Sequence, residues 1–72
     1  MHIRVGNENV RDHRFRSTAK YANKLRPVLC GGEPSMDDIP RDGGRNILGI
    51  PQSMRPSWAA EICPACAALV TP

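Results

Sequence analysis

The chain has 72 residues and a formal net charge of +3, and only 14 of its residues are Leu, Ile, Val or Phe, whereas 13 are Pro or Gly. A chain of this length has room for one small domain at most, and such a domain buries only about 60% of its unfolded surface. This composition excludes a large hydrophobic core, so we expect a metal, a partner or self-association to stabilise any ordered structure.

Positive charge is concentrated at the N-terminal end. Residues 1–26 carry seven basic side chains and two acidic ones, whereas residues 27–72 carry three basic and five acidic ones. The first residues lack the apolar run of a secretory signal, and the apolar stretch 65–70 is far too short to span a bilayer. Three cysteines, an odd number, do not suit a secreted disulfide scaffold. We therefore expect an intracellular protein, cytoplasmic or nuclear, with reduced thiols.

The first predicted element is an amphipathic α-helix over about residues 10–25. Asn9 precedes it as an N-cap, and Pro27 ends it because the residue before a proline is pushed out of the helical region. Apolar side chains recur within it at steps of three and four residues and form one narrow stripe. These side chains are Phe15, Thr18, Ala19, Ala22 and Leu25.

The same segment is strongly basic, and its aromatic side chains could stack on bases. Arginine and lysine on a helix neutralise phosphates, so the segment predicts binding to a nucleic acid or to an acidic protein. A solvated helix face is the simpler alternative. The basic side chains are Arg11, Arg14, Arg16, Lys20, Lys24 and Arg26.

The remainder of the chain is predicted to be mostly irregular. Two clusters of turn residues predict a loop over 30–46, and the apolar residues after the second cluster predict a short strand at 45–50. A short turn is expected at 58–62. Proline is favoured at the first position of a helix, so a second turn is expected to begin at Pro64.

The expected fold is thus a small, mostly irregular chain with one amphipathic N-terminal helix and a short C-terminal helical turn. It is expected to be partly disordered unless a metal or a partner holds it together. Residues 1–72 would form a single small domain or a partly disordered chain. Its parts are a basic helical segment at 9–26, a Gly/Pro-rich loop segment at 27–57 and a Cys-x-x-Cys tail at 58–72.

The tail contains Cys63-Pro64-Ala65-Cys66, whose spacing lets two thiolates reach one metal ion. This string resembles the Cys-Pro-x-Cys-Gly half-sites of zinc ribbons and rubredoxin-like proteins, except that Ala67 stands where those half-sites prefer Gly. The resemblance implies a zinc site, which would need Cys30 and one more ligand. His13 is preferred as that ligand because it lies in the predicted helix, whereas His2 lies at an end expected to fray. Asp37 and Asp38 are further alternatives.

The string also resembles a glutaredoxin active site, in which the first thiol of the pair is the nucleophile. That resemblance implies a thioredoxin-like fold, which is excluded because only six residues follow Cys66. A redox-sensitive dithiol, or small semi-apolar side chains without chemistry, remain open. Neither histidine has an identifiable nucleophile partner, and the glycine pairs do not form a phosphate loop, so we do not expect an enzyme.

The leading hypothesis is a small intracellular binding or accessory protein that contacts an anionic partner through its basic helix. The alternative is a small zinc-stapled module that uses Cys30, Cys63 and Cys66, with His13 as the fourth ligand. A further alternative is the precursor of a modified peptide with its core at about 61–72, or a chain with no selected function. Steep salt dependence of binding would indicate the first, and stoichiometric zinc would indicate the second.

Overall fold

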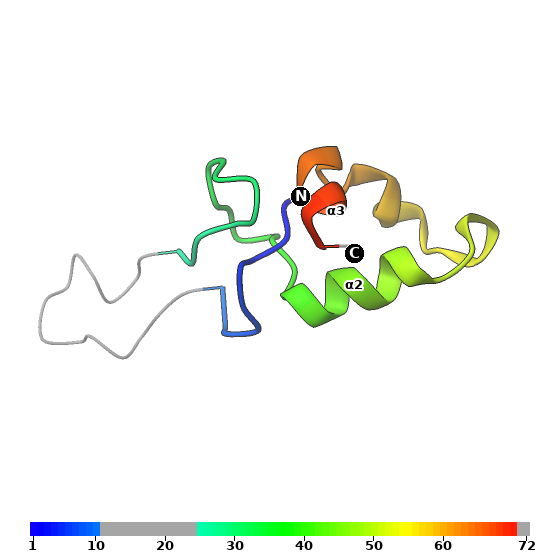
Figure 1. Cartoon of the computed structure of the whole chain (residues 1–72), viewed down its shortest axis with the longest axis horizontal. Coiled ribbons are helices and arrows are strands. Elements are labelled where there is room, and N and C mark those ends of the chain that lie inside the picture. The colour runs from blue at the N-terminus through cyan, green and yellow to red at the C-terminus, as the bar shows by residue number, and fades with distance from the viewer. Residues whose placement is uncertain (11–24, 71–72) are drawn as a thin grey trace, which may run out of the picture.

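The computed structural model describes residues 1–10 and 25–70. In chain order, these ranges contain helix α2 (Arg41–Gly49), the 3-10 helices η1 (Gln52–Met54) and η2 (Ser57–Glu61), and helix α3 (Pro64–Val70), as Figure 1 shows. None of the helices in these ranges is long and apolar enough to cross a membrane.

The predicted fold class is wrong, because its main element, the helix at 10–25, is not seen. Residues 11–24 of that helix lie outside the described residues, and its two described ends, Val10 and Leu25, are not helical. The Arg26 amide donates to the Val10 carbonyl at 2.8 Å. A single straight helix over 10–25 would instead hold its two ends roughly 22 Å apart. The described helices are α2 and α3, and both follow the segment that was expected to be the helix.

The N-terminal segment lies in the centre of the fold and pairs with backbone on both of its sides. Ile3 forms a parallel bridge with Ile39, and Arg4 forms an antiparallel bridge with Val28. Amide-to-carbonyl hydrogen bonds of 2.8–3.0 Å join the segment to 27–29 on one side and to Ile39 on the other. These pairings satisfy backbone groups that burial would otherwise leave without partners.

The core is small and lies between this segment and the helices. It consists of Ile3, Val28, Ile62, Cys66 and Val70, each no more than 6% exposed. Helices α2 and α3 contact each other beside it (Figure 1). Among the residues that the structure describes, five buried apolar side chains are few even for a domain of this length.

Helix α2 occupies a stretch where the sequence predicted a loop and then a short strand, and both predictions are wrong here. Its sequence, RDGGRNILG, contains three glycines, each of which disfavours a helix by about 1 kcal/mol relative to alanine. Tertiary packing outweighs that cost. Gly44 is buried against Ile3, and a Cβ atom at Gly44 would come within 2.9 Å of the Ile3 side chain. The glycine therefore permits the close approach of α2 to the N-terminal segment.

Both ends of α2 are capped by side chains from outside the helix, one distant in sequence and one close to it. At its start, the Asp42 amide donates to Asn7 Oδ1 at 2.9 Å, and Asn7 Nδ2 donates to Asp42 Oδ2 at 2.8 Å. At its end, the Arg55 guanidinium donates to the Leu48 and Ile50 carbonyls, both at 2.9 Å. These side chains satisfy amides and carbonyls that a helix end leaves free.

The last two elements agree with the turns that the sequence predicted there. A 3-10 helix covers most of the expected turn at 58–62, and α3 begins at Pro64. The Cys63 carbonyl accepts the first helical hydrogen bond, from the Ala67 amide at 2.9 Å. A proline loses nothing at this position because the first amides of a helix have no partner within the helix.

Candidate metal centre

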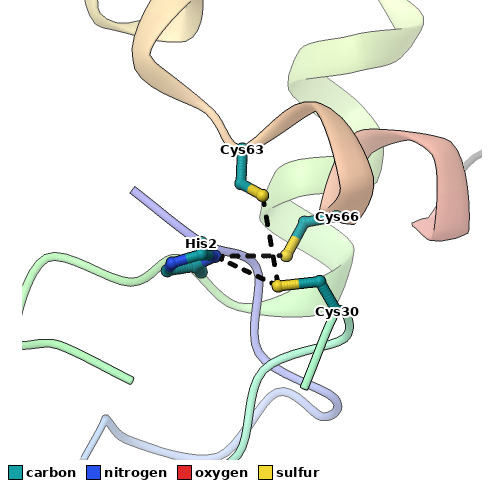
Figure 2. Close-up of side chains that lie close together, drawn as sticks. All are labelled: His2, Cys30, Cys63 and Cys66. Atoms are coloured by element: carbon teal, nitrogen blue, oxygen red, sulfur yellow. Dashed lines mark hydrogen bonds between the residues drawn. The ribbon is translucent and has the colours of Figure 1, made fainter. Parts of the chain in front are cut away.

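Three segments bring together four side chains that could hold a metal ion. His2 comes from the N-terminal segment, Cys30 from the turn after Val28, and Cys63 and Cys66 from the start of α3 (Figure 2). One donor atom from each lies within 4.8 Å of the other three. Cys66 is fully buried, whereas the other three are half-buried.

Three of the distances between the donor atoms are close to those around a single tetrahedral ion, and all of them are within 4.8 Å. Cys30 Sγ and Cys66 Sγ lie 3.3 and 3.6 Å from His2 Nδ1, and Cys63 Sγ lies 4.0 Å from Cys30 Sγ. Zinc binds sulfur at about 2.3 Å and imidazole nitrogen at about 2.0–2.1 Å, so tetrahedral geometry separates two sulfurs by roughly 3.8 Å and a sulfur and a nitrogen by roughly 3.6 Å. These three separations are therefore compatible with one shared ion.

His2 is held in place through its backbone on both sides. Its amide donates to Asp38 Oδ1 at 3.2 Å, and its carbonyl accepts the Ile39 amide at 3.0 Å. The next residue, Ile3, is fully buried. The N-terminal segment was expected to fray, but these contacts anchor it in the core and direct the imidazole Nδ1 at the sulfurs.

Asp38 positions His2 and does not join the four donors. Its side chain also accepts hydrogen bonds from the amide and hydroxyl of Ser35, at 2.8 and 3.1 Å, and its carbonyl accepts one from the buried Arg4 guanidinium. Asp37 accepts a hydrogen bond from the Ser35 hydroxyl. Neither carboxylate, both considered as ligands from the sequence, belongs to the cluster.

The turn that carries Cys30 depends on two glycines. The Gly31 amide donates to the Val28 carbonyl at 3.1 Å. Gly31 adopts a φ of 73°, which is unfavourable for residues other than glycine. The Gly32 amide then donates to Cys30 Sγ at 3.4 Å. A Cβ at Gly32 would lie 3.1 Å from that sulfur and 3.3 Å from the His2 ring. The Gly-Gly pair thus leaves room for the cluster and supplies an amide to the Cys30 sulfur.

The Cys-x-x-Cys pair uses the first turn of α3 in a comparable way. The Cys63 amide donates to the Met1 carbonyl at 2.7 Å, which joins this turn directly to the N-terminal segment. Hydrogen bonds from the Cys66 and Ala65 amides lower the pKa of Cys63 to about 7. Free amides at a helix start favour the thiolate, which is the form that binds metal.

The pKa values of His2, Cys30 and Cys66 are also shifted, in part by hydrogen bonds within the cluster. Hydrogen bonding to Cys66 is the largest cause that raises the pKa of His2, and it outweighs burial. The Gly32 amide acts to lower the pKa of Cys30, but burial and hydrogen bonds with Cys66 and Cys63 outweigh it and raise that pKa. Burial acts to raise the pKa of Cys66, but hydrogen bonds, including one with His2, lower it. The cluster therefore favours thiolates at two of its three cysteines.

These shifts predict an order of thiol reactivity in the metal-free, reduced protein. Near pH 7, Cys63 is expected to react with iodoacetamide faster than Cys30, because its pKa is lowered to about 7 while that of Cys30 is raised. Timed alkylation followed by peptide mass spectrometry measures both rates. The difference should shrink as the pH is raised towards 9, and equal rates at pH 7 would contradict the prediction.

The structure brings together the three cysteines that were predicted from the sequence to bind metal and adds His2 as the fourth member. The preferred histidine, His13, lies outside the described residues. The sequence offered little to favour His2, because it lies near the start of the chain and outside any recognised ligand motif.

The predicted anion-binding side chains are almost all outside the described residues. This holds for Arg11, Arg14, Arg16, Lys20 and Lys24. Arg26 is described, and it forms an ion pair with Glu8 at 3.2 Å. Phosphate binding by the basic segment therefore stays a prediction.

Comparison of the chain with protein-family models, with curated proteins and with solved structures finds no match. The interpretation of the four-residue cluster therefore depends on its own donor set and geometry. Three sulfurs and one imidazole nitrogen, all within 4.8 Å of one another, form a group that could hold a metal ion.

Proposed function

We propose that this chain is a small structural zinc module in which His2, Cys30, Cys63 and Cys66 bind one Zn²⁺. The observation that carries the proposal is the convergence of these four donors from three segments, at separations close to those of a tetrahedral zinc site. Three thiolates and one imidazole are a usual ligand set of structural zinc sites. The metal would tie the N-terminal segment, the turn at 28–32 and the start of α3 to one another.

The composition of the site favours a structural role over a catalytic one. Catalytic zinc sites have three protein ligands and keep a fourth position for water or substrate, whereas four protein ligands fill a tetrahedral site. Four donors here can fill it. We therefore propose that the module is not an enzyme, and that it acts within the cell, where its thiols stay reduced.

The test is a comparison of the two histidines. Native mass spectrometry of freshly purified, reduced protein is expected to give one zinc ion per chain. His2→Gln should lower zinc affinity at least tenfold in a competition with a chromophoric chelator, whereas His13→Gln, the matched control, should leave it unchanged. A bare-chain mass with three alkylatable thiols would refute the zinc module, and loss of zinc only in His13→Gln would assign the fourth ligand to His13.

A second function is supported by the way the basic segment is attached. Residues 11–24 carry five basic side chains and one acidic one. The described residues on its two sides lie next to each other, since the Arg26 amide donates to the Val10 carbonyl at 2.8 Å. We propose that the zinc-stapled part of the chain presents this segment to an anionic partner, and that the partner is a nucleic acid.

Salt dependence and charge reversal test this second function. Affinity for a single-stranded oligonucleotide should fall steeply as salt rises, because binding releases counterions. Reversing Arg16, Lys20 and Lys24 to Glu should abolish binding while zinc content stays at one per chain. Binding that is insensitive to salt, or that survives the charge reversal, would refute it.

A further inference from the structure

The four donors differ in how accessible they are. Cys30 and Cys63 are half-buried, and their sulfurs lie 4.0 Å apart (Figure 2). Cys66 is 0% exposed, and its sulfur lies 3.9 Å from the buried Ile3 carbonyl. A solute that diffuses to the cluster therefore meets Cys30 and Cys63 before Cys66. These two cysteines are 33 residues apart in the sequence, whereas Cys63 and Cys66 form the local pair.

We propose that Cys30 and Cys63 are a redox modification site, at which a hydroperoxide converts the two thiolates to a disulfide and releases the zinc ion. The proposal rests on the proposed zinc module. The disulfide would join the turn at 28–32 to the start of α3, two of the three segments that the metal ties. A covalent disulfide would thus replace the metal as the link between these two segments.

The reaction balances with hydroperoxide as the oxidant. One thiolate attacks the peroxide O–O bond, which breaks, and the sulfur becomes a sulfenic acid while one hydroxide leaves. The second thiolate attacks that sulfur, forms the S–S bond and expels the second hydroxide. The two sulfurs together lose two electrons, hydrogen peroxide gains them, and two protons convert the products to two molecules of water. A zinc ion at the site would then keep only His2 and Cys66 as ligands, which would weaken its binding.

The backbone around the two sulfurs suits the formation of this bond. The sulfurs must move from 4.0 Å to the disulfide length of about 2.05 Å. Cys30 precedes two glycines, and nothing lies within 4 Å of the space beside Gly31, so the turn has room to adjust. Cys66 sits within α3 with its side chain in the core, so movement of its sulfur would disturb the packing.

The experiment uses the full chain, reduced, with its zinc content measured first. Hydrogen peroxide is added in small excess, and released zinc is followed with a chromophoric chelator. After alkylation of the remaining thiols, trypsin cleaves at Lys24, Arg41 and Arg45, so that Cys30 and the Cys63/Cys66 pair fall on different peptides. The expected product is a cross-link between peptides 25–41 and 46–72 with alkylated Cys66, formed together with release of one zinc per chain.

Two serine variants identify the sulfurs. Cys66→Ser should still form the cross-link, whereas Cys63→Ser should lose it at least tenfold. A disulfide within peptide 46–72 as the main product would overturn the proposal, and so would release of zinc without any disulfide. If the untreated protein holds no zinc, the proposed module fails, and the cross-link still decides whether Cys30 and Cys63 are the oxidised pair.

Discussion

Removing zinc from the metal-loaded protein with a strong chelator is expected to abolish its cooperative thermal unfolding and most of its helical circular dichroism. Within residues 1–10 and 25–70, the buried core has five apolar side chains. Structural zinc contributes about 10–16 kcal/mol of apparent binding free energy at pH 7, which exceeds the whole folding stability of most small domains. His2 is 28 positions from Cys30 and 64 from Cys66, so loss of the metal would release contacts that nothing local replaces.

The control is the return of zinc to the same sample, which should restore both signals. Lowering the pH should mimic the chelator, because protons compete with the metal for the three thiolates and the imidazole. An unfolding midpoint and a spectrum that do not change when zinc is removed would show that the core suffices without it. That outcome would count against a structural role for the metal even if zinc binds.

Ile3→Ala is expected to be the most damaging single substitution outside the metal ligands. Ile3 is fully buried, it contacts α2 at Gly44, and it directly follows His2. Removing a buried isoleucine side chain typically costs about 2–5 kcal/mol. Because folding and metal binding are coupled, apparent zinc affinity should fall roughly 30-fold or more, which chelator competition measures.

Val5→Ala is the matched control, since Val5 lies two residues further along the same segment and is 47% exposed. A substitution at such a site usually changes stability by no more than about 0.5 kcal/mol. Denaturant unfolding of the zinc-loaded variants should therefore separate the two clearly. Equal losses of unfolding free energy in the two variants would contradict the central position of Ile3.

The C-terminal part of the site could be predicted from the sequence because its signals are local. Cys63 and Cys66 are three residues apart, and Pro64 marks the first position of α3 between them. Three cysteines in a chain with little core already indicated a metal as one way to stabilise the fold. Each of these inferences needs only neighbouring residues and the composition.

The fourth donor and helix α2 could not be predicted in this way. His2 was rejected because chain ends fray in isolation, and the contacts that hold it come from Asp38 and Ile39. Helix α2 was missed because Gly43 and Gly44 are poor helix formers. Its stability comes from packing on Ile3 and from a cap at its start supplied by the distant residue Asn7.

The sequence by itself determined that the chain has few apolar residues for a core, that three cysteines are available as metal ligands, and that a Cys-x-x-Cys pair stands at the start of its last helix. Only the tertiary structure decided which histidine joins the sulfurs and which part of the middle segment is helical. The physical reason is the same in both cases. Hydrogen bonds and packing between residues more than 25 positions apart outweigh local propensity, and such contacts leave no periodic pattern in the sequence.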